Sequence, residues 1–260
     1  MSDPINLSQS VSTNLLTLQR TSGNIASTQT RLSTGLKVNS ALDNAAAFFT
    51  AKALNDTAKD FDDLKSSIDL AISTIQTAID GIDAISELVN QAKGLASNAK
   101  ATGDTNERST LAVQFNELLK QINTIANDSS FNGTNLLQAT PDNLAVEFNT
   151  DNTSNLTITG LDSTTATSGI NIAVAANNFG LNANIDTALT AISSALTTLR
   201  SNASTMGSNN TILTTRLNFT DNLVNTLEGG NGKLTLADLN EESANLLALQ
   251  TRQQLGINSL

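Results

Sequence analysis

The chain has 260 residues and a net charge of −10, and its apolar content comes mainly from alanine, leucine and isoleucine. Aromatic residues make up only 3% of it, with no tryptophan and no tyrosine, so we expect no bulky globular core. The acidic balance argues against nucleic acid and anionic membrane surfaces as partners, because both are bound through lysine and arginine. No apolar run approaches the ~20 residues of a spanning helix, so we expect no membrane insertion.

The chain contains neither cysteine nor histidine. Disulfides, thiolate nucleophiles, Ser-His-Asp triads and the usual zinc ligand sets are therefore excluded. We take this double absence as an argument against enzymatic function, and we expect no cofactor and no metal. The first thirteen residues also lack the basic start and apolar core of a cleaved signal peptide. We expect the chain to stay in the cytoplasm or to leave by a route that needs no such peptide.

A first helix is predicted over residues 5–33, with a weak apolar stripe that polar residues interrupt. Gly23 would weaken an isolated helix here by roughly 1 kcal/mol relative to alanine, so this segment needs a partner to pack against. Residues 33–44, which include Gly35, are predicted to form a linker or turn. The apolar members of the stripe are Val11, Leu15, Leu18, Ile25 and Leu32.

A second, long helix is predicted from Ala45 to about Ala101. Its apolar residues recur at alternating steps of three and four, which places one narrow seam along the helix. Only a partner helix buries such a seam efficiently. The larger members of the seam are Leu64, Ile68, Ile75, Ile82, Ile85 and Val89.

A third helix is predicted after the break at residues 102–104, with Asp104 or Thr105 as its N-cap. It is expected to stop at residues 127–130, before a turn at Asn132 and Gly133. After Pro141 the apolar spacing changes from helical to alternating, which predicts a β-hairpin and a third strand. The strand residues are Leu144, Val146 and Phe148, then Leu156 and Ile158, then Ile170, Ile172 and Val174.

The long helical pattern returns near Asn184 with a second seam of the same spacing. The glycines of residues 228–232 are expected to stop this helix and to form a hinge. Residues 239–260 are predicted to form a final, polar-rich helix whose apolar contacts come from Leu239, Leu246 and Leu249. The larger members of the second seam are Leu189, Ile192, Leu196, Leu199, Leu213 and Leu217.

These elements predict a mainly α fold, a long antiparallel coiled-coil-like helix bundle with a small β-hairpin insertion. Both terminal helices are too polar to be stable alone, so we expect them to pair with each other and to become ordered late. The pattern is typical of a subunit that self-assembles.

Three stretches of the sequence are similar to bacterial flagellin, the filament subunit. They are residues 31–46 (RLSTGLKVNSALDNAA), 131–137 (FNGTNLL) and 237–256 (ADLNEESANLLALQTRQQLG). Taken in this order they extend the resemblance over essentially the whole chain, and the short central insertion is typical of compact flagellins. The resemblance implies a structural subunit that self-assembles into the bacterial flagellar filament used for motility.

The resemblance also implies a division into domains. Residues 1–40 and 233–260 would form the filament-core domain, and the apolar residues of both terminal helices would be the self-assembly residues. Residues 41–140 and 184–232 would form the rod domain, and residues 141–183 a short variable β insertion. The chain stops at Leu260, whereas family members continue for a few helical turns, so we expect a trimmed chain or an incomplete core domain.

Several partners follow from the same resemblance. The subunit is expected to form a homo-polymer with other flagellin subunits, to be exported unfolded through the flagellar type III apparatus with an export chaperone, and to contact the cap and junction proteins. The implied location is secreted, in the filament. Weak binding to the innate receptor TLR5 is expected, because Asn90 stands where strongly stimulating flagellins carry arginine. Phe48 and Phe49, which depart from the family pattern, are expected to be buried anchors of the rod.

Two other functions remain open at this stage. A hook-filament junction protein shares the pattern of the two ends, and it would cap hooks without elongating. A cell-surface adhesin would need a large, groove-bearing insertion in place of the small β segment predicted here.

Overall fold

The computed structural model describes residues 9–258, and the fold is mainly α with small antiparallel hairpins, as predicted. Packing divides the chain into two compact units. One consists of the residues up to Lys59 together with those from Leu223 onward, and the other is Asp60–Asn222. Within the described range, no helix combines the length and the apolar character that crossing a membrane requires.

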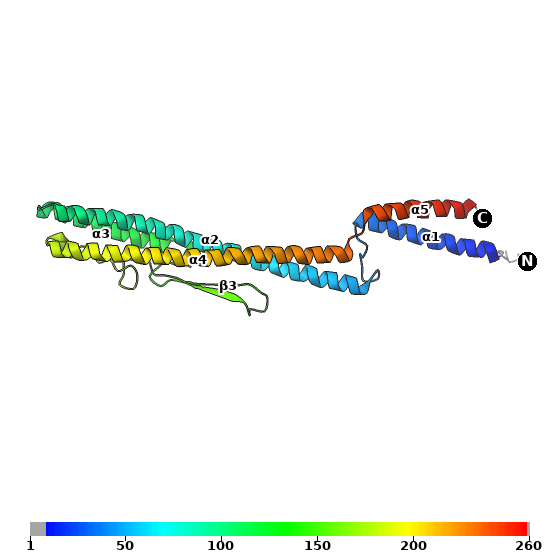
Figure 1. Cartoon of the computed structure of the whole chain (residues 1–260), viewed down its shortest axis with the longest axis horizontal. Helices are drawn as coiled ribbons and strands as arrows, with labels where there is room; N and C mark the ends of the chain where they lie inside the picture. Colours follow the sequence, from blue (N-terminus) through cyan, green and yellow to red (C-terminus); the bar gives the residue numbers. More distant parts are fainter. Residues whose placement is uncertain (1–8, 259–260) are drawn as a thin grey trace, which may run out of the picture. The chain divides into compact units, whose positions relative to one another are not determined.

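Five α-helices and one 3-10 turn account for the helical structure (Figure 1). The second and fourth helices contain 57 and 54 residues, about 85 and 80 Å at 1.5 Å per residue. Asp104 is the N-cap of the third helix, where its Oδ1 accepts a hydrogen bond from the Asn106 N–H at 2.8 Å. In chain order they are α1 (Gln9–Thr34), α2 (Ala45–Ala101), α3 (Thr105–Asp128), η1 (Ala176–Phe179), α4 (Asn182–Thr235) and α5 (Leu239–Asn258).

The strands form two short antiparallel pairs. The first pair is β1 (Ser130–Phe131) with β2 (Thr134–Asn135), joined by a two-residue turn in which Asn132 and Gly133 both have positive φ, 49° and 81°. The second pair is the predicted hairpin, β3 (Asn143–Glu147) with β4 (Asn155–Thr159).

The third predicted strand does not form, and this prediction was wrong. Ile170 and Ile172 are buried as the alternating pattern requires, but Val174 is 67% exposed. The N–H groups of this segment donate to the carbonyls of the preceding loop, Ile170 to Thr164 at 2.8 Å and Ile172 to Thr165 at 3.2 Å.

Side chains of α3 hold the backbone on either side of the segment. The Ala175 N–H donates to the Asn116 Oδ1 at 2.8 Å, and the Thr165 N–H donates to the Asn123 Oδ1 at the same distance.

The glycines of residues 228–232 do not stop α4, which continues to Thr235, so this prediction was also wrong. Leu54 of α2 lies within van der Waals distance of the Cβ position of Gly230, and this packing helps to keep the segment helical. The helix ends where the segment that follows α1 donates hydrogen bonds to its last carbonyl groups. The Thr235 carbonyl accepts from the Lys37 N–H at 2.7 Å, and the Lys37 Nζ donates to the Lys233 carbonyl at 2.8 Å.

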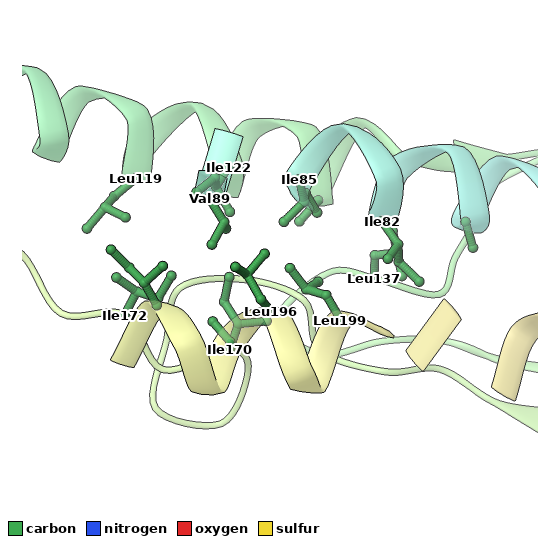
Figure 2. Close-up of a cluster of buried hydrophobic side chains, with 14 of the residues drawn as sticks. Ile82, Ile85, Val89, Leu119, Ile122, Leu137, Ile170, Ile172, Leu196 and Leu199 are labelled. Carbon is green, nitrogen blue, oxygen red and sulfur yellow. The ribbon is translucent and has the colours of Figure 1, made fainter. Parts of the chain in front are cut away.

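The Asp60–Asn222 unit is built on one continuous apolar core. α2, α3 and α4 lie alongside one another there, and the labelled side chains of Figure 2 point into a common interior from α2, α3, α4 and the insertion. Phe115 and Phe179 meet edge to face inside it, with ring centroids 5.2 Å apart. Arg216 lies over the ring of Phe148 at 4.8 Å, beside the β3–β4 hairpin.

The expectation that Phe48 and Phe49 are both buried is wrong for Phe49. Phe48 is partly buried, whereas Phe49 is 61% exposed, and the two rings touch edge to face at 5.6 Å. Neighbouring positions point in directions about 100° apart on a helix, so one of two adjacent phenylalanines leaves the packed side.

Candidate self-assembly surface

The two terminal helices α1 and α5 lie side by side and antiparallel (Figure 1). Arg31 Nη1 forms an ion pair with Glu242 Oε1 at 3.1 Å near one end of the pair. Gly256 meets Leu18 further along, so closely that a Cβ on this glycine would lie 2.9 Å from the Leu18 Cδ2. Residues far apart in the chain therefore form one continuous two-helix surface.

The pair has polar groups where a stable coiled coil would have apolar ones. Thr21 and Thr28 of α1 are 4% and 6% exposed, and Glu242 of α5 is 8% exposed. Within the described residues, neither helix contributes a fully buried apolar side chain. A groove of about 380 Å³ also opens between them, lined in part by Arg31, Glu242 and Arg252. This interface is only partly closed within one chain.

The predicted self-assembly residues occupy two kinds of position on this surface. Leu15 and Leu239 are 46% and 50% exposed. The others are partly buried: Val11, Leu18, Ile25, Leu32, Leu246 and Leu249. Other members of the first and last helical predictions, Ile5 and Leu260, lie outside the described residues.

Sequence reasoning missed the polar residues that face inward. In α1 the covered positions include Thr21 and Thr28, which the predicted apolar stripe did not contain. Threonine spaced by seven residues between apolar positions was the available signal. The contact between Gly256 and Leu18 was also missed, because a glycine has no apolar side chain that would add to the spacing pattern.

The two connections that leave the helix pair are hydrogen-bonded to each other. Leu36 and Leu236 form an antiparallel β-bridge, and the Ala237 N–H donates to the Gly35 carbonyl at 2.9 Å. Gly35 has φ = 72° at the end of α1, where its N–H donates to the Arg31 carbonyl. Asp238 Oδ1 caps α5 by accepting from the Asn240 N–H at 2.9 Å.

The predicted rod seam lies at the interface of α2 and α4. Ion pairs flank this interface, Lys65 with Asp221 and Lys100 with Asp186, each at 2.5 Å, and they fix the two helices as antiparallel. Three seam residues are only partly buried: Leu64, Leu189 and Leu217. The rest are at most 8% exposed: Ile68, Ile75, Ile82, Ile85, Val89, Ile192, Leu196, Leu199 and Leu213.

Two protein-family regions match this chain, one on each side of the hairpin. The bacterial flagellin N-terminal helical region matches residues 5–142, and the bacterial flagellin C-terminal helical region matches residues 189–260. The chain belongs to the bacterial flagellin family. The two family regions lie on either side of the segment that contains the whole β3–β4 hairpin.

Individual flagellins are similar over nearly the whole chain. Flagellin FljO of Caulobacter vibrioides is 34% identical over 253 residues, which are 95% of this chain and 89% of that protein. A flagellin of Brucella melitensis is 29% identical over 257 residues, 95% of this chain and 90% of its own length. The crystal structure of Bacillus cereus flagellin has a TM-score of 0.52 at 20% identity and covers 59% of this chain and 88% of its own, a likeness of fold.

This flagellin is therefore a structural subunit of the bacterial flagellar filament, which serves motility, and it polymerises with other flagellin subunits. The relatives named above are flagellins and give no support to a hook-filament junction protein or an adhesin.

Proposed function

We propose that α1 and α5 form the filament-core part of this flagellin, and that their packing is completed only by the same helices of neighbouring subunits. The apolar side chains of the pair are half covered within one chain, and this observation carries the proposal. The self-assembly residues are then the eight apolar residues predicted from the sequence.

The energetic argument for this proposal is a balance between burial and chain ordering. Burial contributes roughly 25 cal/mol per Å² of apolar surface, while ordering one backbone residue costs about 1–2 kcal/mol. A two-helix surface with half-exposed leucines and inward-facing threonines gains too little to offset that cost alone. Neighbouring copies supply the missing apolar surface, so ordering and polymerisation are coupled.

The remaining parts of the chain take the roles that the family resemblance suggests. Residues 41–140 and 184–232 form the rod, whose seam residues hold the subunit rigid. Residues 141–183 form an insertion whose buried apolar residues pack into the core of the rod and whose exposed side faces solvent. The subunit leaves the cell unfolded through the flagellar type III apparatus with an export chaperone, and it adds beneath the cap protein beyond the junction proteins. It works as a structural protein without enzymatic activity.

The receptor TLR5 is proposed to bind this flagellin weakly. Asn90 is exposed on α2, where the arginine of strongly stimulating family members would place a charge. A reporter-cell assay should give a weak response, which Asn90→Arg should raise. A full response from the unchanged protein would contradict this part of the proposal.

Polymerisation of two charge variants tests the assembly role directly. Leu18→Asp on α1 and Leu249→Asp on α5 each place a carboxylate among side chains that neighbours should cover, so we expect neither variant to elongate filament seeds. Far-ultraviolet circular dichroism should still show a folded rod. Val174→Asp is the matched control, because Val174 is 67% exposed and lies outside the helix pair.

The outcomes separate assembly from folding. Normal filaments from Leu18→Asp or Leu249→Asp would contradict the proposed role of the pair. Loss of helical signal together with loss of assembly would instead place these residues among those needed for the fold of the monomer.

A further inference from the structure

The sequence contains two Asn-Gly pairs, and the structure places them in different surroundings. Asn132 and Gly133 form the exposed turn between β1 and β2, whereas Asn231 and Gly232 lie inside α4. In such a pair the backbone nitrogen of the glycine can attack the side-chain carbonyl carbon of the asparagine, because glycine has no Cβ that would hinder the approach. The same reactive pair is therefore present once in a turn and once in a helix.

The reacting groups of the turn are not engaged elsewhere in the part of the chain that the structure describes. Neither the Asn132 side-chain amide nor the Gly133 N–H forms a hydrogen bond with a described residue. The Asn132 side chain is exposed, and a Cβ placed on Gly133 would meet no atom within 4 Å. The asparagine side chain therefore has room to turn towards the glycine nitrogen.

The turn can open without unfolding the rest of the subunit. The attack requires the Asn132 backbone to rotate away from its turn conformation of φ = 49°. The β1–β2 ladder that resists this rotation has only two residue pairs, and so short a pair contributes little stability of its own. Asn135, which follows the turn, is held separately, since its N–H donates to the Asp142 Oδ2 at 2.8 Å and its Nδ2 donates to the Ala126 carbonyl at 2.9 Å. Opening is therefore confined to the turn.

The corresponding groups in α4 are blocked. The Gly232 N–H belongs to the hydrogen-bond ladder of the helix, which continues to Thr235. The end of the helix is held further by the Lys37 Nζ, which donates to the Lys233 carbonyl at 2.8 Å. Rotation of the Asn231 backbone would break this part of α4, so the attack is more costly there than in the turn.

We propose that Asn132 is a site of spontaneous deamidation in the folded subunit. The Gly133 nitrogen forms a bond to the Asn132 Cγ, and the side-chain nitrogen leaves as ammonia together with the proton from the Gly133 nitrogen. The product is a cyclic imide, which water opens at either of its carbonyl carbons to give aspartate or isoaspartate. The reaction consumes water and needs no enzyme, and it is independent of the filament function.

The modification changes both the backbone and the charge of the turn. In isoaspartate the main chain runs through the former side chain and is longer by a methylene group, so the two-residue turn with positive φ at both positions no longer fits. Both products also add a carboxylate to a groove of about 230 Å³ that Asn132 and Glu147 both line. We expect the β1–β2 pair to loosen as isoaspartate accumulates.

Peptide mass spectrometry of the folded protein, aged in mildly alkaline buffer, tests the proposal. We expect deamidated Asn132 to accumulate about tenfold faster than deamidated Asn231, because the helix has to open before Asn231 can react. In the chain unfolded by urea, the two sites should react at the same rate.

Hydrogen exchange tests the structural consequence. Asn132→Asp is the matched variant, because it adds the carboxylate without lengthening the main chain. Residues 130–135 should exchange faster in the isoaspartate form, isolated by chromatography, than in Asn132→Asp.

The outcomes separate the turn from the sequence around it. Equal rates at Asn132 and Asn231 in the folded protein would overturn the proposal. A tenfold difference that persists in urea would also overturn it, because the flanking sequence and not the turn would then decide. Equal exchange in the isoaspartate form and Asn132→Asp would contradict the proposed loosening. None of these results would affect the filament role.

Discussion

The terminal helix pair and the three-helix bundle use helices of similar periodicity in opposite ways. In the Asp60–Asn222 unit the positions of the seam are almost all filled by isoleucine, leucine, valine or alanine, and most are buried completely. In the α1–α5 pair the inward positions alternate between half-buried apolar residues and buried threonine or glutamate. The difference shows that heptad-like spacing alone does not make a self-sufficient interface; the chemistry at each inward position decides.

The two regions also differ in how they hold charge. The Asp60–Asn222 unit contains seventeen acidic and seven basic residues, so the whole net charge of −10 belongs to it. The terminal pair instead buries the Glu242 carboxylate beside Arg31. The Arg31 side chain is 40% exposed, so this ion pair is only half buried, and we expect it to contribute little to the net stability of the helix pair.

The largest expected effect comes from opening a cavity in the bundle. Phe115→Ala should lower the free energy of unfolding by about 3–5 kcal/mol, because Phe115 is fully buried against Phe179. The matched change Ile25→Ala in α1 should cost about 1 kcal/mol or less in the monomer, since this side chain is only partly buried. Urea denaturation of both variants measures the contrast. Equal losses would mean that both regions have cores of the same quality.

Two glycines of α2 sharpen the comparison within a single helix. Gly81→Ala should destabilise the bundle by about 1–3 kcal/mol, because its Cβ would clash with the Ser129 Oγ and lie 2.8 Å from the Leu137 Cδ1. Gly94→Ala should stabilise the protein by about 1 kcal/mol, since its Cβ enters open space and alanine favours the helix. Thermal unfolding of the two variants should therefore shift in opposite directions, and a shift of the same sign would contradict this packing.

The connection after α1 should show a smaller, local effect. Gly35→Ala should lower the local opening free energy by about 1–2 kcal/mol, because Gly35 has φ = 72°, a conformation that strains alanine. The new methyl group would meet no atom within 4 Å, so no packing would offset this strain. Hydrogen exchange of the Lys37 and Ala237 amides, which bond across the paired connections, reports this opening. Gly103→Ala, at an open site without positive φ, is the control and should leave these amides unchanged.

The smallest effect concerns the pH dependence of the turn at residues 39–43, where the Asp43 Oδ2 accepts hydrogen bonds from the Asn39 and Ser40 N–H groups. Hydrogen bonds from the Ser40 and Asn39 N–H groups, in that order of strength, hold the pKa of Asp43 below its usual value of 3.8. The Asp43 carboxylate therefore stabilises the turn above the pKa that it has in the unfolded chain. This stabilisation is lost as the pH falls through its lower pKa in the folded protein. An NMR titration of the Ser40 amide should give a midpoint below 3.8, and Asp43→Asn should abolish it. A midpoint at or above 3.8 would show that the carboxylate does not hold this turn.

Much of the fold follows from local sequence signals. The spacing of apolar residues predicted α2 from Ala45 to Ala101, and the Asp104 cap predicted the start of α3. Both signals lie within a few residues of the feature that they determine. The β3–β4 hairpin was predicted for the same reason, because alternation and a polar loop are local.

The errors arose where a distant part of the chain decides. Residues 170–174 alternate like a strand, but the N–H groups of residues 170–172 bond to the carbonyls of residues 164–166, and Asn116 and Asn123 of α3 bind the backbone on either side. The glycine-rich end of α4 stays helical beside Leu54, and α4 ends where Lys37 bonds to its last turn. No pattern within either segment contains this information.

The candidate surface was predicted in part. The sequence indicated which helices meet, and it selected Leu18, Ile25 and Leu249, which are partly covered in the pair. It did not predict the inward threonines, because the stripe was defined by its apolar residues alone. Thr21 and Thr28 nevertheless continue the three-four spacing of Leu18, Ile25 and Leu32, and this spacing was the available signal.

Hydrogen exchange in monomer and filament tests most directly whether the terminal helices depend on neighbouring subunits. In the monomer, the backbone amides of α1 and α5 should exchange nearly as fast as an unfolded chain, while those of α2 around Ile85 stay strongly protected. In the filament, the protection of α1 and α5 should rise to that of α2. Equal and strong protection of all three helices in the isolated monomer would contradict the account.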